Sequence, residues 1–274
     1  MIFICTSMYY EAYPFIKKLN LKKDCNSRKF QIFKNENVIL LITGVGKIKA
    51  TIAVTYLFSK YKPKNSDLFI NIGVCGAKNK NTSIGSVFLC NKIIESDTKK
   101  TFYPDIIFKH PFKEASIETC SLVVDNNNIK FEGQLLDMES SGIYQAATVF
   151  LQTHQIFFIK IVSDHLNTEN LNQNIVLKLI EDKATQIINW VTEIKLGFLY
   201  DSNVLSQKEQ ETLDCLVKNL KLSSTMKNQL KQLFIYYKLQ YNDFTNIINT
   251  YINIKCKSKN EGKRYFAEIK QKLI

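Results

Sequence analysis

The stretch LFINIGVCGA, residues 68–77, joins an apolar run to two glycines that stand three residues apart. Residues 68–74 are predicted to form a buried strand, because a short apolar run of this length is typical of a strand inside a sheet. Gly73 and Gly76 fall at its carboxyl end, where bare backbone allows a flat ligand to lie close. The same glycines are equally compatible with a bulge or a bend.

On both sides of this stretch, over roughly the first 195 residues, short apolar runs alternate with amphipathic stretches. This alternation predicts an α/β fold in which helices flank a central sheet. The helix expected at 47–61 has an apolar face that carries Ile48, Ile52, Tyr56 and Leu57. The remaining expected strands are 2–6, 29–34, 38–43, 86–94, 134–138 and 157–162, and the remaining expected helices are 10–19, 140–150 and 172–193.

The pattern changes near Lys195, after which no strand pattern recurs. Ser206 and Glu209 have the spacing of a capping box, and apolar stripes predict further helices from about residues 225, 243 and 263. We therefore expect two domains, an α/β domain at 1–195 and an all-helical extension at 196–274. The extension could cover the first domain, form an oligomer interface, or bind a partner protein or nucleic acid.

Composition excludes several classes of protein. With 45% hydrophobic and 23% charged residues in 274, wholesale disorder is excluded. No apolar run approaches the roughly 18 residues of a spanning helix, and the first residues lack a signal sequence, so we expect a cytoplasmic protein without membrane contact. The seven cysteines are scattered without a C-x-x-C pair, which predicts neither a disulfide framework nor a metal site.

The formal charge of +12 suggests nucleic acid as a partner, because phosphates attract Lys and Arg. A bias of composition explains it better: Lys, Asn and Ile are abundant along the whole chain, while arginine occurs only at Arg28 and Arg264. We therefore do not expect a nucleic-acid partner. The densest basic cluster lies in the helical extension, at Lys255, Lys257, Lys259, Lys263 and Arg264.

Three further segments join a predicted strand to a predicted helix or loop. TGVGK, residues 43–47, could approach a ligand, but it lacks the spacing of a P-loop and is more simply a tight turn. LDMESS, residues 136–141, places Asp137 where a helix cap is expected, while Glu139 could point into a cleft. KIVSD, residues 160–164, ends an apolar strand in Ser163-Asp164, either at a ligand site or as a cap.

Taken in order, these four segments resemble the purine nucleoside phosphorylase/uridine phosphorylase superfamily, and within it most closely the 5′-methylthioadenosine/S-adenosylhomocysteine nucleosidases. The resemblance covers roughly residues 1–193. It implies a mixed, twisted central sheet flanked by helices and, in most nucleosidases of the family, a homodimer. It implies no metal ion and no organic cofactor.

The resemblance also implies roles for particular residues. Glu11 matches the glutamate that activates the attacking water, and Asp164 matches the acid that protonates the purine at N7, oriented by Ser163. Glu139 matches the residue that binds the ribose hydroxyls. The other implied substrate contacts are Gly73, Val74, Cys75 and Gly76 beside the base and ribose, and Met138 against the ribose.

The implied reaction is hydrolysis of the N-glycosidic bond of a nucleoside. Such cleavage builds positive charge on the sugar and negative charge on the base, which an acid beside the base and a carboxylate with water opposite would compensate. The related bacterial phosphorylases carry an arginine and a Ser or Thr where this chain has Asn71 and Val74, so hydrolysis is favoured over phosphorolysis. A phosphorylase, or an inactive nucleoside-binding or partner-docking protein, stays open as an alternative.

The part of the site that would hold the purine is less defined, because the resemblance is weak between residues 91 and 124. Tyr103, Phe112 and Phe131 could stack on a base, but aromatic residues in such positions are more often core residues. The expected substrate is a 5′-substituted adenosine, with methylthioadenosine, S-adenosylhomocysteine and 5′-deoxyadenosine as the alternatives.

Overall fold

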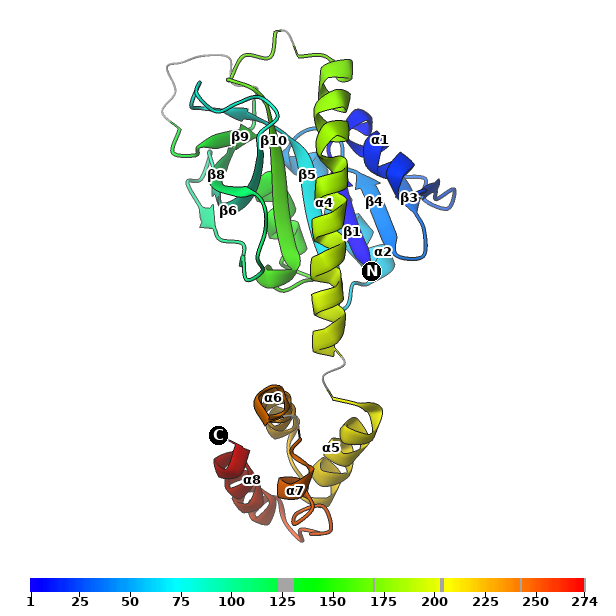
Figure 1. The fold of residues 1–274 in the computed structure, drawn as a ribbon, viewed down its shortest axis with the longest axis vertical. Coiled ribbons are helices and arrows are strands. Elements are labelled where there is room, and N and C mark those ends of the chain that lie inside the picture. Colours follow the sequence, from blue (N-terminus) through cyan, green and yellow to red (C-terminus); the bar gives the residue numbers. More distant parts are fainter. Residues whose placement is uncertain (123–130, 170, 203–204, 242, 274) are drawn as a thin grey trace. The chain divides into compact units, whose positions relative to one another are not determined.

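The computed structural model describes residues 1–122, 131–169, 171–202, 205–241 and 243–273. The chain divides into two compact units, Met1–Leu196 and Gly197–Ile274, and each is described by itself (Figure 1). The first unit is a mixed α/β structure, as predicted, and the second contains helices only.

Four parallel strands form the centre of the sheet in the first unit. β5 (Leu68–Ala77) lies between β1 (Ile2–Thr6) and β10 (Ile156–Asp164), and β1 also pairs with β4 (Val38–Ile42). Their carboxyl ends therefore meet at one edge, where open α/β sheets bind ligands. Beyond β4 the sheet continues antiparallel through β3 (Gln31–Lys34) and β2 (Lys22–Lys23).

On the other side of β5 the strands close into a ring. β10 pairs with β6 (Val87–Glu95), β6 with β8 (Lys113–Thr119), β8 with β9 (Leu135–Asp137), and β9 returns to β5 at Gly76 and Ala77. The short strand β7 (Thr101–Phe102) pairs with β6. Because β9 runs antiparallel to β5, its last residues lie beside the end of β5, next to the edge that the parallel strands share.

Helices cover both faces of this sheet (Figure 1). Phe3 and Phe69 pack on one face with side chains of α2 (Lys47–Tyr61) and α3 (Ser140–Ala147). Phe58 of α2 lies at the centre of that layer, with its ring 5.3 Å from that of Phe3 and 5.1 Å from that of Phe69. On the opposite face, Ile2, Ile4 and Ile72 meet α1 (Tyr9–Lys18) and α4 (Gln173–Ser202). The alternation of residues along β1 thus supplies both layers of the core.

The buried face of α2 differs from the predicted one. Its buried residues are Ala50, Ala53, Val54, Leu57 and Phe58, while Ile48 and Ile52 are 74% and 56% exposed. The reason is the close approach of α2 to α3: a Cβ on Gly142 would come within 2.6 Å of the Lys47 carbonyl oxygen. Only small side chains fit such a contact, and the periodicity of large aliphatic residues does not reveal them.

The second unit forms its own hydrophobic core. Its helices are α5 (Gln207–Asn219), α6 (Ser224–Tyr241), α7 (Thr245–Ile248) and α8 (Lys259–Leu273). The predicted capping box is present, since the Glu209 amide donates to Ser206 Oγ and the Ser206 amide donates to Glu209. The core includes Leu213, Leu216, Leu220, Leu230, Phe234, Phe244, Ile248 and Ile269. No helix in the described residues is long and apolar enough to span a membrane.

Candidate active site

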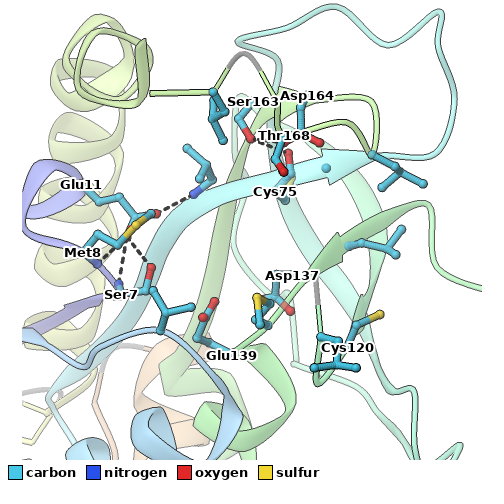
Figure 2. A pocket seen from close by; sticks show the side chains of 18 residues that line it. Ser7, Met8, Glu11, Cys75, Cys120, Asp137, Glu139, Ser163, Asp164 and Thr168 are labelled. Atoms are coloured by element: carbon cyan, nitrogen blue, oxygen red, sulfur yellow. Dashed lines mark hydrogen bonds between the residues drawn. The ribbon is translucent and has the colours of Figure 1, made fainter. Parts of the chain in front are cut away.

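A cavity of about 250 Å³ opens at the shared carboxyl edge of β1, β5 and β10, beside the end of β9. Glu11, Glu139 and Asp164 all line it, although they stand far apart in the sequence. Figure 2 shows Glu11 on the α1 side, Glu139 at the start of α3 and Asp164 at the end of β10, around the same cavity. The geometric condition of the predicted site, that these three carboxylates converge, is therefore met.

Glu11 is held rigidly at the start of α1. Its Oε2 accepts hydrogen bonds from the amides of Ser7 and Met8, both at 2.9 Å, and from Ser7 Oγ at 2.7 Å. Its Oε1 accepts from the Val74 amide at 3.0 Å, which ties the start of α1 to the end of β5. The local sequence explains the hydrogen bonds from Ser7 and Met8. A glutamate in the first turn of a helix can accept from the free amides that precede the helix.

Gly73 does not line the cavity, unlike the other substrate contacts predicted on β5, Val74, Cys75 and Gly76. A Cβ at Gly73 would lie 3.1 Å from Glu11 Oε1. The absence of a side chain at Gly73 therefore makes room for the Glu11 carboxylate. The predicted role of Gly73 was direct contact with a ligand, which is a different role.

Glu139 is bound by the turn that precedes α2. Its Oε1 accepts a 2.8 Å hydrogen bond from the amide of Gly46, which precedes the first residue of α2. Gly44 and Gly46 have φ angles of 82° and 103°, which only glycine adopts easily, so the turn needs both. Burial raises the pKa of the Glu139 carboxyl, helped by the nearby Asp137 carboxylate, to about 7.

The part of the cavity lining that contains Glu139 is supported by a buried ion pair. This pair was not predicted from the sequence. Lys160 Nζ on β10 lies 2.8 Å from Asp137 Oδ2 at the end of β9, and both side chains are almost fully enclosed. Asp137 also accepts from the amide of Ser140, the first residue of α3, at 2.9 Å and from Thr119 Oγ1 at 2.8 Å, although the N-cap position itself is Glu139 and not Asp137 as expected. The signal in the sequence was a lysine inside the apolar run FFIKIV, residues 157–162.

The charges of the pair hold each other ionised. Burial on its own would raise the pKa of Asp137, but the Lys160 ammonium outweighs it and lowers that pKa. Burial likewise would lower the pKa of Lys160, but the carboxylates of Asp137 and Glu139 leave it raised. Asp137 is therefore an anion that also repels a negative charge on Glu139.

Asp164 ends β10 at a shift of register against β5, directly opposite Gly76. Its Oδ2 lies 2.7 Å from Ser163 Oγ, so the predicted Ser163–Asp164 pair is in contact. A Cβ at Gly76 would lie 3.1 Å from Asp164 Oδ1 and 2.8 Å from Leu166. The alternative that Asp164 caps a helix is wrong, because the next helix begins only at Gln173.

The rest of the wall is mostly apolar and includes Met138, as predicted. Sequence reasoning missed most of the other apolar members, which are Met8, Val45, Cys120, Leu122, Leu136, Leu166 and Leu171. No Lys, Arg or His occurs among the described residues that line the cavity. Within the same described residues, no group of three or more His, Cys, Asp or Glu side chains is arranged to hold a metal ion.

The three aromatic residues considered for base stacking are absent from the described wall. Tyr103 is 60% exposed, and Phe112 packs edge-on against Trp190 with ring centres 5.2 Å apart. Phe131 is buried in a small cluster with Cys120 and Leu136. Phe112 and Phe131 are therefore core residues, which was the alternative to base contact, whereas the exposed Tyr103 is neither a core residue nor part of the described cavity lining.

Comparison with known proteins shows which proteins this chain is similar to. Residues 3–125 match the family model described as the phosphorylase superfamily. A 5′-methylthioadenosine/S-adenosylhomocysteine nucleosidase of Staphylococcus epidermidis is 32% identical over 107 residues, which are 38% of this chain and 46% of that protein. One from Staphylococcus aureus is 32% identical over 72 residues, 26% of this chain and 30% of that protein. The chain thus spans less than half the length of these curated relatives.

The solved structures that resemble this chain cover a larger share of it. A Streptococcus pyogenes S-adenosylhomocysteine nucleosidase aligns with a TM-score of 0.60 and 18% identity, over 69% of this chain and 95% of that one. A Helicobacter pylori futalosine hydrolase aligns with a TM-score of 0.59 and 13% identity, over 70% of this chain and 98% of that one. The predicted resemblance to the phosphorylase superfamily and the predicted fold class are therefore confirmed.

Proposed function

We propose that the unit Met1–Leu196 is a purine nucleosidase that hydrolyses the N-glycosidic bond of 5′-substituted adenosines. The observation that carries the proposal is the convergence of Glu11, Glu139 and Asp164 on one cavity. The similarity to nucleosidases over part of the chain supports the same class of reaction.

In the proposed reaction each of the three carboxyl groups has a separate task. Glu139 accepts hydrogen bonds from the ribose hydroxyls, with Met138 packed against the sugar. Asp164, oriented by Ser163, donates a proton to N7 of the purine as negative charge develops on the leaving base. Glu11 activates a water molecule that attacks the anomeric carbon from the opposite side. Val74, Cys75 and Gly76 form the wall beside the base.

Water is favoured over phosphate as the nucleophile. A bound phosphate dianion needs cationic or N–H ligands, and the described wall contains four acidic side chains and no basic one. The buried cation Lys160 is already paired with Asp137, which lines the cavity. A phosphorylase is the second candidate, and an inactive nucleoside-binding protein is the third.

A homodimer is part of the proposal because apolar side chains are exposed on α1 and α2, two helices that begin within two residues of Met8 and Val45 in the cavity lining. Tyr9 and Tyr13 of α1 and Ile48 and Ile52 of α2 are exposed, as is Val45, which lines the cavity itself. Apolar surface gathered near a site marks a contact with another protein surface. A protein partner for the helical unit and a cytoplasmic location stay predictions.

The test is release of free adenine by the purified full chain, with and without phosphate. We expect phosphate-independent release from methylthioadenosine, and a loss of about 10²–10⁴ in kcat for Asp164→Asn, the range for one general acid. Glu169→Gln is the matched control, because Glu169 is exposed and does not line the cavity. Strict dependence on phosphate would favour the phosphorylase, and normal turnover by folded Asp164→Asn would refute the assignment of the acid.

A further inference from the structure

We infer that Lys47 is a positioning residue for ribose binding, because its ion pairs anchor the turn that presents the Gly46 amide to Glu139. The inference rests on the proposed function, in which Glu139 binds the ribose hydroxyls. It gives a role to the lysine of the TGVGK segment, residues 43–47, which the proposed reaction leaves unused.

The ammonium group of Lys47 joins two acidic residues. Its Nζ lies 2.6 Å from Glu95 Oε1 and 2.6 Å from Asp97 Oδ2. Burial alone would lower the pKa of Lys47, but its hydrogen bonds to Asp97 and Glu95 leave that pKa raised, so the ammonium stays charged. The Lys47 side chain is only 18% exposed, so water and salt screen these pairs less than they screen a pair at the surface.

The aliphatic part of the Lys47 side chain lies against the first turn of α3. A Cβ added to Gly142 would come within 2.9 Å of Lys47 Cγ, so a side chain at that position would displace the lysine. Gly142 is the third residue of α3, and Glu139 directly precedes the helix. Lys47 therefore contacts the turn of α3 that follows Glu139.

The backbone of the same lysine continues the turn that binds Glu139. Gly46 directly precedes Lys47, and its amide donates the 2.8 Å hydrogen bond to Glu139 Oε1. Both Gly44 and Gly46 have positive φ angles, and glycine has many other conformations available when nothing holds it. The anchored side chain of Lys47 therefore fixes one end of a turn that is otherwise free to change conformation.

The ion pairs also connect Lys47 to a second part of the cavity lining. Asp97 Oδ2 accepts a 2.6 Å hydrogen bond from Ser121 Oγ. Ser121 stands between Cys120 and Leu122 in the sequence, and both of these residues line the cavity. Two parts of the lining are thus held by one cluster of charges.

Loss of the charge at Lys47 should weaken ribose binding and leave the chemical step almost unchanged. Without the ion pairs the turn releases the Gly46 amide from Glu139, and the carboxylate loses the donor that fixes its orientation. In the proposed reaction Glu139 binds the ribose in the bound substrate and in the transition state alike. An interaction that is equal in both states changes KM rather than kcat.

The experiment compares Lys47→Met with Lys60→Met in the full chain. Methionine keeps an unbranched apolar side chain beside Gly142 and removes the charge. Lys60, in the last turn of α2, pairs with Asp24 at 3.0 Å, and neither of the two lines the cavity. For methylthioadenosine we expect KM at least fivefold higher in Lys47→Met, with kcat within threefold of the wild type. Both constants should stay within threefold in Lys60→Met.

A second measurement does not depend on activity. Hydrogen–deuterium exchange followed by NMR should be at least fivefold faster at the Gly46 amide of Lys47→Met than in the wild type. The Val74 amide, which donates to Glu11, is the control in the same spectra and should change less than threefold. If Lys47→Met does not fold, Asp97→Ala takes its place, since that side chain is 52% exposed, and it should speed Gly46 exchange at least twofold.

Failure of the inference differs from failure of the proposed function. A smaller effect on Gly46 exchange or on KM contradicts the inference, as does a loss that falls on kcat or that Lys60→Met reproduces. If the wild type releases no adenine, the proposed hydrolysis fails. Exchange at the Gly46 amide then decides by itself whether Lys47 positions the turn.

Discussion

At the scale of single residues, opposing influences act on the carboxyl group of Glu139. Burial and the Asp137 carboxylate raise its pKa, while the Lys160 ammonium and the Gly46 amide lower it, and the result is about 7. In an unfolded chain the value is near 4.5, so between pH 4.5 and 7 the folded protein binds more protons. Stability is therefore lost as the pH rises through this interval, by at most about 3 kcal/mol.

Glu139→Gln should remove this loss of stability. The free energy of unfolding should fall less for the variant than for the wild type between pH 5 and pH 8, by roughly 1–3 kcal/mol, because glutamine does not ionise. Urea unfolding followed by the fluorescence of Trp190, the single tryptophan, measures the first unit. Glu181→Gln, an exposed carboxyl on α4, is the control, and equal pH slopes for wild type and Glu139→Gln would contradict the argument.

At the scale of elements, the Lys160–Asp137 pair joins β10 to the junction of β9 and α3. These two strands are not neighbours in the ring, since β9 pairs with β5 and β8. The pair therefore bridges across the strand between them. Glu139, which lines the cavity, follows Asp137 by two residues.

Lys160→Met should destabilise the first unit by about 3–5 kcal/mol, because it leaves the Asp137 carboxylate buried without a cation. Adding Asp137→Asn should restore much of that loss, since asparagine still accepts a hydrogen bond from Ser140 and carries no charge. A double-mutant cycle measures the coupling energy. It compares the free energies of unfolding of the wild type, the two single variants and the double variant. Additive effects of the two substitutions would show that the pair is not coupled.

At the scale of the whole molecule, the candidate site is confined to the first unit. The described residues that line the cavity run from Ser7 to Leu171, and the unit Gly197–Ile274 packs around its own core. The sequence predicts an apolar stripe on several helices of the second unit, and each of these helices contributes residues to that core. The second unit thus has a hydrophobic core of its own, as a separate domain does.

A fragment of residues 1–202 should fold and should keep the adenine release of the full chain within about threefold, because it contains the complete described wall and all of α4. Circular dichroism and Trp190 fluorescence report folding, and the adenine assay reports activity. A folded fragment without activity would show that the second unit takes part in catalysis. An insoluble fragment would show that it covers surface of the first.

Much of the architecture could be predicted from local sequence. The strand at 68–74, the helix at 47–61 and the capping box at Ser206 depend on residues within a few positions of one another, so periodicity and spacing reveal them. The motif residues at strand ends could be predicted too, because parallel strands bring their carboxyl ends to one edge. β8 was missed, since its KEASIET sequence lacks a long apolar run.

Contacts between distant residues were decided only by the tertiary structure. The Gly46–Glu139 hydrogen bond spans 93 positions and the Lys160–Asp137 pair spans 23, and neither residue type nor local spacing specifies such partners. The same holds for the buried face of α2, which depends on how closely α3 approaches. Local pattern determines which elements form, because backbone preference and side-chain period act over a few residues. Packing of the elements determines which charges meet, because burial and electrostatic pairing depend on distance in space.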